Sequence, residues 1–336
     1  MELAYSLLRN PLVCIRLTYI SRRWPTPGVF FSDIFSRQLI SFYNSLLMLN
    51  FRMGCAVWAF KDWVGNFYPA KSQPTNFLRL YGERLLTVEG NTTFYSVPSA
   101  EMVQRWVNHT PSEFRFCPKL PRAVTHEGLL MAHLPAALSF LELMQGLGDR
   151  LGPIMAQLPP RYSPAAFDDL AAFLKAWPRQ DAPISVEVRH LDWFQGEPAR
   201  RLSALLTGLQ VGRVLLDSRS MYAWENVGDA DPQQHSNRRK PNVPLQPEVT
   251  ADFAIVRYIS HPRIFRNQDY LAEWVPQIAA WLAAQKQVYF FVHCPQEVNS
   301  PEVVRYFQAQ LESAGSPVPP LPWDMLAQPP DQLSLL

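Results

Sequence analysis

The stretch LLTVEGNTTFYSVPS, residues Leu85–Ser99, is the best guide to the fold of this chain. Its first residues, LLTV, predict a short buried strand, because the apolar run is too brief and too rich in β-formers for a helix. The strand ends in Glu89, followed by a glycine and Asn91. Burying an unpaired carboxylate is costly, so Glu89 is either paired or lies at a solvent-accessible mouth. In parallel α/β folds that mouth is where ligands bind, which makes Glu89 a candidate functional residue.

The composition indicates a globular protein with a large core. The chain has 336 residues, of which 48% are hydrophobic and 12% aromatic. Its formal net charge of +2 gives no global basic field to recruit nucleic acid or an anionic membrane. Four scattered cysteines without metal-binding spacing are typical of thiols in a reducing compartment, so we expect a cytoplasmic protein. We find no uncharged apolar run of about 18 residues and predict no membrane span.

Residues 1–50 differ from the rest of the chain. They hold five arginines against two acids, an excess of +3, so the remainder sums to −1 by subtraction from +2. An acid-poor leader that contains arginine fits either an organelle transit peptide or a segment ahead of a true start near Met48 or Met53. We predict that this leader lies outside the folded domain.

From Phe51 onward, short apolar segments alternate with amphipathic ones. Strands are predicted at 51–58, 85–89, 114–119, 152–159, 184–190, 212–217, 253–260 and 287–293. Helices are predicted at 75–84, 100–108, 135–147, 164–177, 197–208, 270–284 and 301–313. Eight strands that alternate with helices predict a parallel sheet, and eight is the number that closes a TIM barrel. We therefore expect an α/β fold with a single (β/α)8 barrel over 51–315 and a proline-rich tail over 316–336.

Polar side chains lie at the carboxyl ends of several predicted strands. They are Glu89 with Asn91, Lys119, Glu187 with Arg189, Asp217, Arg257 with Tyr258, and His293. In a TIM barrel these strand ends meet at one face, so the residues are expected to line one pocket. Each one has a structural explanation when taken alone: Glu187 and Arg189 share a strand face and can pair, and Lys119 can extend to solvent. Their occurrence at the same end of many strands instead indicates a site.

Several longer runs resemble a known family. These runs are GCAVWAFKDWVGNFYP (54–69), VEGNTTFYSVP (88–98), FRFCPKLPRAVTHE (114–127), VEVRH (186–190) and VRYIS (256–260). They resemble the YecE-like family, domain of unknown function 72, over residues 51–313. The resemblance implies a TIM barrel and no assigned activity. By the family pattern the important positions are Glu89, Asn91, Thr93, Tyr95, Lys119, Thr125, His126, Glu187, Arg189, Asp217 and Arg257. The chain departs at FFVHCP (290–295), where relatives look like a Tyr-Phe-Asn-Asn run, so the resemblance gives His293 no role.

The first functional hypothesis is a hydrolase or lyase that acts on a small polar, sugar or phosphorylated substrate. The candidate catalytic residues are Glu89, Lys119, His126, Glu187 and Asp217. The candidate substrate-binding residues are Asn91, Thr93, Tyr95, Thr125, Arg189 and Arg257. Glu89 and Glu187 would supply an acid and a base if their surroundings separated their pKa values, and two such carboxylates also suit glycoside cleavage. The arginines suit a phosphate or carboxylate group.

The two acids are expected to differ in exposure. Glu187 and Arg189 lie two residues apart on one strand, so we expect a buried ion pair that faces the barrel interior. Glu89 is followed by a glycine, and we expect it to be exposed at the mouth. On that expectation E89Q melts at or above the parent temperature and E187Q melts below it.

Two other classes stay open. A divalent-metal isomerase or endonuclease-like barrel would use Glu89, Glu187, Asp217 and His126 as ligands. The cations nearby and the lack of metal-binding spacing place it below the first hypothesis, so we predict no metal and no cofactor. A non-catalytic barrel that binds ligand or nucleic acid would use aromatic loops and the basic cluster 238–240, within a link over 218–252 long enough for a functional loop. A small anionic or sugar-like ligand is favoured over nucleic acid, and the sequence does not determine the oligomeric state.

Overall fold

The computed structural model describes residues 50–223 and 240–326. These residues contain eight strands: β1 (Phe51–Cys55), β2 (Thr87–Gly90), β3 (Arg115–Pro118), β4 (Ile154–Gln157), β5 (Ile184–Glu187), β6 (Gly212–Asp217), β7 (Phe253–Ile259) and β8 (Gln287–His293). The predicted leader up to residue 49, two of the three residues of the basic cluster 238–240, and the tail from residue 327 lie outside the described residues. The predicted limits of the domain remain a prediction.

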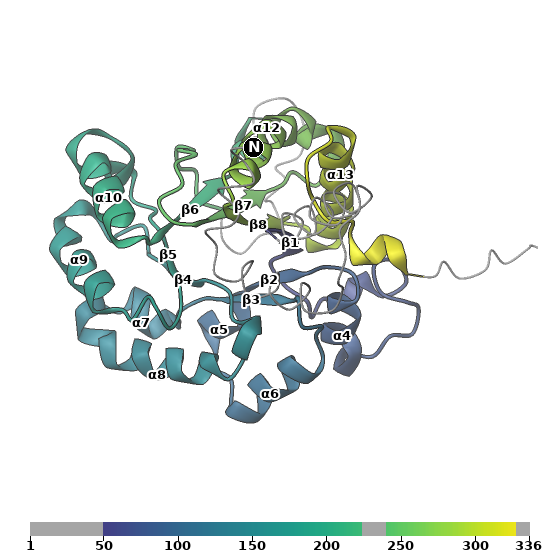
Figure 1. The fold of residues 1–336 in the computed structure, drawn as a ribbon, viewed down its shortest axis with the longest axis horizontal. Helices are drawn as coiled ribbons and strands as arrows, with labels where there is room; N and C mark the ends of the chain where they lie inside the picture. The colour runs from purple at the N-terminus through teal and green to yellow at the C-terminus, as the bar shows by residue number, and fades with distance from the viewer. Residues whose placement is uncertain (1–49, 224–239, 327–336) are drawn as a thin grey trace, which may run out of the picture. The chain divides into compact units, whose positions relative to one another are not determined.

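The strands form one parallel sheet that curls into a barrel. Their order is β3-β2-β1-β8-β7-β6-β5-β4, so strands that are consecutive in sequence lie side by side, except that β3 and β4 stand at the two ends and β1 pairs with β8. The outermost strands, β3 and β4, approach each other through isolated bridges that join Phe116 to Leu151 and Lys119 to Met155. Figure 1 shows the helices around the outside of these strands. The prediction of a single (β/α)8 barrel is confirmed.

Ten helices accompany the strands in the described part of the chain. They are α4 (Phe77–Gly82), α5 (Asn91–Tyr95), α6 (Ala100–Asn108), α7 (Arg122–His126), α8 (Leu134–Gln145), α9 (Phe167–Ala176), α10 (Gly196–Leu209), α11 (Arg219–Tyr222), α12 (Gln268–Ala283) and α13 (Ser300–Ser313). None of the described helices is long and apolar enough to cross a membrane. The short helix α5 follows β2 directly and α7 begins shortly after β3, where the sequence predicted loops. Five residues are too few to display a helical period, so the pattern gave no signal there.

Two apolar layers show which way most strand residues face. A large cluster packs the helices against the outside of the barrel, while a smaller one fills its inside. The inner cluster is Cys117, Met155, Val214, Ala251, Phe253, Ile255, Tyr289 and Phe291. Since side chains alternate along a strand, the residues two positions beyond these also face inward, at the carboxyl end of the barrel.

The chain after α13 packs against the barrel as far as it is described. Val318 and Leu321 are buried, and the Gln308 side chain donates a hydrogen bond to the carbonyl of Pro319 at 2.7 Å. The Trp323 ring lies edge-on to Phe67, with ring centroids 4.8 Å apart. Residues 316–326 therefore bury apolar surface against the outer layer of the domain.

Candidate functional site

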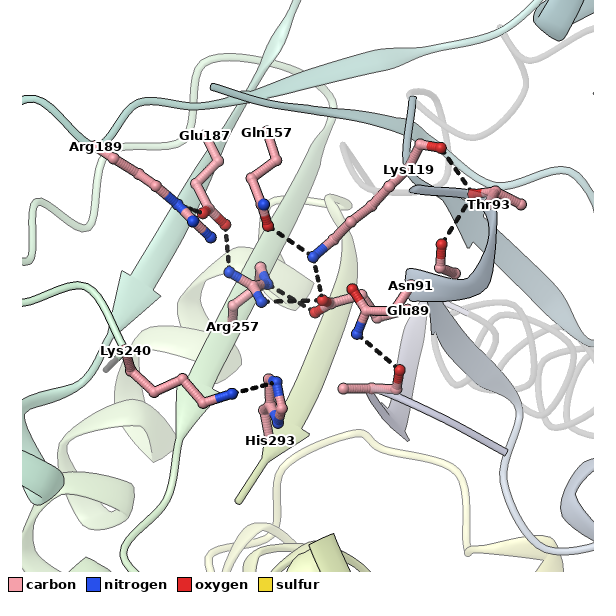
Figure 2. A network of polar contacts seen from close by, with 12 residues as sticks. Glu89, Asn91, Thr93, Lys119, Gln157, Glu187, Arg189, Lys240, Arg257 and His293 are labelled. Atoms are coloured by element: carbon pink, nitrogen blue, oxygen red, sulfur yellow. Dashed lines mark hydrogen bonds and ion pairs between the residues drawn. The ribbon is translucent and has the colours of Figure 1, made fainter. Parts of the chain in front are cut away.

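Several of the inward-facing residues at the carboxyl end of the barrel are polar. Glu89 pairs in register with Cys117, Gln157 with Glu187, and Arg257 with Phe291. Register partners in a parallel sheet share a face, so the inner apolar layer fixes the direction of these side chains. Together with Lys119 they form a buried group, in which no residue is more than 7% exposed. Figure 2 shows their side chains pointing toward one another.

Arg257 of β7 joins the two glutamates. Its Nε donates to Glu89 Oε2 at 2.7 Å and its Nη2 to Oε1 at 3.0 Å, which makes a bidentate pair. Its Nη1 donates to Glu187 Oε2 at 2.5 Å. Two carboxylates that the sequence separates by almost a hundred residues therefore share one guanidinium.

Lys119 follows β3 and completes the contacts of Glu89. Its Nζ lies 2.6 Å from Glu89 Oε1 and donates to Gln157 Oε1 at 2.8 Å. The Thr93 hydroxyl lies 2.7 Å from the carbonyl oxygen of Lys119 and 2.9 Å from that of Gly90. Thr93 thus ties the end of β3 to the end of β2 and positions the lysine.

Arg189 lies at the edge of this group and uses only one of its guanidinium nitrogens to bind Glu187. Its Nε donates to Glu187 Oε1 at 2.5 Å, which confirms the expected ion pair, and its side chain is 16% exposed. Within residues 50–223 and 240–326, neither of its two terminal nitrogens has a hydrogen-bond partner. Counting Glu89, Glu187, Lys119, Arg189 and Arg257 gives two negative and three positive charges. The group therefore carries a net charge of +1 and an arginine with free donors.

The pKa values of the two glutamates move in the same direction. Burial raises the pKa of Glu89, but the charges of Arg257 and Lys119 outweigh it and hold the pKa well below its usual range. Burial also raises the pKa of Glu187, but the charges of Arg189 and Arg257 outweigh this effect and lower the pKa to about 2. The predicted separation of one protonated and one ionised glutamate is therefore wrong. The physical reason is the shared cation, Arg257, which favours the ionised form of both.

Lys119 is the member of the group whose proton is most easily exchanged. Burial and the charge of Arg257 lower its pKa to about 8, against the opposing effect of Glu89. A lysine of this kind exchanges its proton near neutral pH, which an ordinary lysine does not.

Glu89 is fully buried, so the expectation that it would be exposed at the mouth is wrong. Its strand position directs the carboxylate into the barrel toward Arg257. Helix α5 then begins at the next residue but one, and Asn91 donates a side-chain hydrogen bond to the carbonyl of Ala56 at 2.8 Å. The glycine after Glu89 therefore leads directly into a helix rather than into a loop.

Asp217 does not join the group, although it ends β6. It pairs in register with Tyr258, which packs in the outer layer, so its carboxylate faces the helices. It accepts hydrogen bonds from Arg219 Nε at 3.0 Å and from Trp274 Nε1 at 2.9 Å. Asp217 and the residues around it lie on the opposite face of the sheet from Arg257.

Three further candidates are grouped on α5 and α7. Thr125 Oγ1 lies 2.8 Å from His126 Nδ1, and the His126 ring packs edge-on to Phe94 at 5.0 Å. Tyr95 packs against the same phenylalanine and is 75% exposed. These contacts place His126 and Tyr95 against Phe94, and they join Thr125 to His126.

The four residues considered as metal ligands are not brought together. Arg257 lies between Glu89 and Glu187, and Asp217 faces outward. In the part of the chain that the structure describes, no group of three or more His, Cys, Asp or Glu side chains is placed to hold a metal ion.

Gln157 is the member of the group that sequence reasoning missed. It is the last residue of β4 and holds the ammonium of Lys119. The signal was present, because an amide at a strand end meets the same criterion that selected Asn91.

Known proteins resemble this chain in sequence and in fold. A family model described as "Protein of unknown function DUF72" matches residues 52–326. The UPF0759 protein YecE of Escherichia coli K12 is 33% identical over 228 residues, which cover 68% of this chain and 82% of that protein. A solved DUF72 family protein from Thermotoga maritima has a TM-score of 0.57 at 20% identity, covering 78% of this chain and 99% of that one. Another, from Enterococcus faecalis, has a TM-score of 0.57 at 16% identity, covering 78% and 95%. At these identities the structural likeness supports the fold alone.

Proposed function

The chain belongs to the DUF72 family, and on that premise we propose that it is an acid–base enzyme, a lyase or hydrolase, that acts on a small anionic substrate. The family carries no assigned activity, so the proposal rests on the site. The observation that carries it is the buried group around Arg257, with its net positive charge and the two terminal nitrogens of Arg189, which have no hydrogen-bond partner among the described residues.

The charge balance favours an anion. Buried charges are tolerated where they are paired, and here three cations face two carboxylates. A ligand carboxylate or phosphate would offset the excess charge and accept hydrogen bonds from the terminal nitrogens of Arg189. The 16% exposure of this side chain allows a small ligand to reach it.

Lys119 is the proposed proton-transfer residue. Its pKa of about 8 lies close to neutral pH, where general acids and bases work best. Glu89 and Gln157 hold its Nζ in place at 2.6 and 2.8 Å. Glycoside cleavage by two carboxylates is less well supported, because it requires one protonated acid and both glutamates are held ionised.

A reducing location is supported by the thiols. Cys55, Cys117 and Cys294 are free and buried. We keep a cytoplasmic location as part of the proposal, because unpaired thiols persist in reducing compartments.

Anion binding tests the proposal. Calorimetric titration with malonate and with inorganic phosphate would compare the parent with R189M. We expect the parent to bind one of the two anions and R189M to lose about tenfold or more in affinity, the loss expected for a charged hydrogen bond. R219M is the matched control, because Arg219 also pairs with a strand-end carboxylate but lies outside the barrel. Equal affinity in parent and R189M, or an equal loss in R219M, would contradict the proposal.

The role of Lys119 is tested by the pH dependence of the same titration. The parent should bind the anion less tightly as the pH rises through about 8, because the cluster loses a positive charge there. K119M should bind without that transition. A transition that survives in K119M would assign the proton to another group.

A further inference from the structure

Four arginines are almost entirely buried in the described part of the chain, and three of them face a carboxylate. None of the four is more than 7% exposed. The pairs are Arg257 with Glu89 and Glu187, Arg84 with Glu83 at 3.7 Å, and Arg213 with Glu248 at 3.5 Å. The fourth is Arg52, and no carboxylate among the residues that the structure describes forms an ion pair with it. Burying an unpaired cation is costly, so Arg52 differs from the other three in a way that calls for a counter-charge.

Arg52 faces into the barrel at its amino-terminal end. It is the second residue of β1 and pairs in register with Tyr289, which belongs to the inner apolar cluster. Arg115, the first residue of β3, is on the same face, because Cys117 two positions later also belongs to that cluster. Both arginines lie near the starts of parallel strands, whereas the group around Arg257 lies toward their carboxyl ends. The two groups are therefore at opposite ends of the barrel.

The contacts of Arg52 use little of its hydrogen-bonding capacity. Its Nε donates to the carbonyl of Glu113 at 3.4 Å, which is longer than a normal N–H···O hydrogen bond. The centre of the Tyr289 ring lies 5.9 Å from the guanidinium carbon, near the outer limit of a cation–π contact. Over residues 50–223 and 240–326, neither terminal nitrogen of Arg52 has a hydrogen-bond partner. Unlike Nη2 of Arg213, which is unpartnered and fully enclosed, these two nitrogens are open to a small ligand.

The charges around Arg52 favour an anion. Burial is the main cause that lowers its pKa, and the charge of Arg115 lowers it further. An arginine remains charged all the same, so the site stays positive. Within the described ranges, the side chain of Arg115 donates only to the carbonyls of Ser112 and Phe114, at 2.9 and 3.0 Å. The carboxylate of Glu113 accepts a hydrogen bond from the Ser112 hydroxyl at 2.8 Å rather than from either arginine.

We infer that a small inorganic anion, of the size of chloride, binds the terminal nitrogens of Arg52 inside the amino-terminal end of the barrel. This site goes beyond the proposed function and shares no residue with it. The anion would take the place that Glu83 and Glu248 take beside two of the other buried arginines. An exposed fraction of 7%, with Cys117 and Tyr289 of the inner cluster nearby, suits a small ion rather than an organic ligand. Its binding would stabilise the folded domain, because the unfolded chain holds no such site.

The effect of chloride on thermal unfolding tests this inference. The full chain carrying R189M would be melted in sodium chloride and in sodium gluconate at equal ionic strength, since gluconate is too large for the site. R189M removes the anion site of the proposed function, so that only the second site responds. We expect the melting temperature to be about 2 °C or more higher in chloride than in gluconate.

Adding R52M to R189M should abolish this difference. It should also leave the melting temperature in gluconate at or above that of R189M alone, because an unpaired buried charge is removed. R84M is the matched control in the same background, since Arg84 is as little exposed as Arg52 but has Glu83 beside it. We expect R84M to keep the difference between the two salts. Loss of the difference in R84M would overturn the assignment of the chloride effect to Arg52.

Bromide locates the anion without a variant, so the inference stays testable even if R52M fails to fold. Crystals of the full chain soaked in sodium bromide should give an anomalous difference peak at hydrogen-bond distance from the terminal nitrogens of Arg52. Bromide peaks at exposed arginines but not at Arg52 would mean an adventitious ion only and would overturn the inference. A water molecule at Arg52 that bromide does not displace would do the same.

The two anion sites are separated by the variants. Equal melting of R189M in chloride and gluconate would overturn the site at Arg52 and leave the proposed function untouched. The malonate and phosphate titrations depend on Arg189, at the other end of the barrel. A chloride effect that persists in R189M, together with failed titrations, would support the site at Arg52 and contradict the proposed function alone.

Discussion

Two strand-end carboxylates of this barrel, Glu89 and Asp217, have the same burial and opposite surroundings. Both are fully buried, and both bind an arginine through two nitrogens. Glu89 faces inward, where Arg257 binds both Glu89 and Glu187. Lys119 contacts Glu89 and donates a hydrogen bond to Gln157. Asp217 faces outward, where its other partner is the Trp274 indole of α12.

The difference follows from alternation along the strand. The residue before Asp217 pairs in register with Arg257, so a shift of one position moves a carboxylate from the inner to the outer face. Position at a strand end therefore does not by itself make a residue part of the site. The face of the sheet decides that, and the partners follow from the face.

Removing Arg257 should have the largest effect. R257M leaves two fully buried carboxylates without their shared cation, and breaking one buried pair already costs about 3–5 kcal/mol. We expect a loss of about 5 kcal/mol or more in urea denaturation at pH 7, close to the total stability of many domains. Lowering the pH toward about 5 should restore part of it, since the carboxylates can then protonate. R189M is the control, because Glu187 retains Arg257 in that variant. A parent-like R257M would contradict the central role of this residue.

Neutralising Glu89 should cost more than neutralising Glu187. Glu89 contacts both buried cations, Arg257 and Lys119, whereas one of the two partners of Glu187 is the partly exposed Arg189. We expect E89Q to lose about 3–5 kcal/mol and E187Q to lose somewhat less, measured by urea denaturation. This order reverses the one expected from sequence, which assumed an exposed Glu89. If E89Q melted at or above the parent temperature, the inner network would not hold Glu89 as described.

Acid should weaken the inner network through Glu187. Its pKa in the folded protein, about 2, lies below its value of about 4.3 in an unfolded chain. The resulting stability is present above the unfolded pKa and is lost as the pH falls toward 2, by roughly 3 kcal/mol. The unfolding free energy of E187Q should therefore vary less between pH 4.5 and 2 than that of the parent. E127Q, which changes an exposed glutamate, should keep the parent slope. Equal slopes in E187Q and the parent would refute this source of acid sensitivity.

Asp217 should give the smallest effect and none on the site. D217N can keep a hydrogen bond with the Trp274 indole but loses its charge beside the partly exposed Arg219. We expect a cost of about 1–3 kcal/mol in urea denaturation, with malonate or phosphate affinity unchanged in calorimetry. A loss of anion affinity comparable to that of R189M would show that the face of the sheet does not separate the two clusters.

The fold could be predicted because its signals are local. Each strand is a short apolar run and each long helix an amphipathic one, so eight alternations suffice to predict the barrel. The same local signals place Glu89, Lys119, Glu187 and Arg257 at the end of the barrel where sites occur. The one-turn helices α5 and α7 were not predicted, because a single turn is too short to show a helical period in the sequence.

The sequence alone determined which polar residues reach the carboxyl end of the barrel, and the tertiary structure decided which of them meet. Arg257 binds Glu89 across 168 positions of the chain, and a pairing of that range leaves no local pattern. Strand register then determined that Asp217 faces outward and that Glu89 faces into the barrel, where it is buried. The shared guanidinium also set the protonation of both glutamates, because a pKa depends on the charges that surround a group in space rather than on its neighbours in sequence.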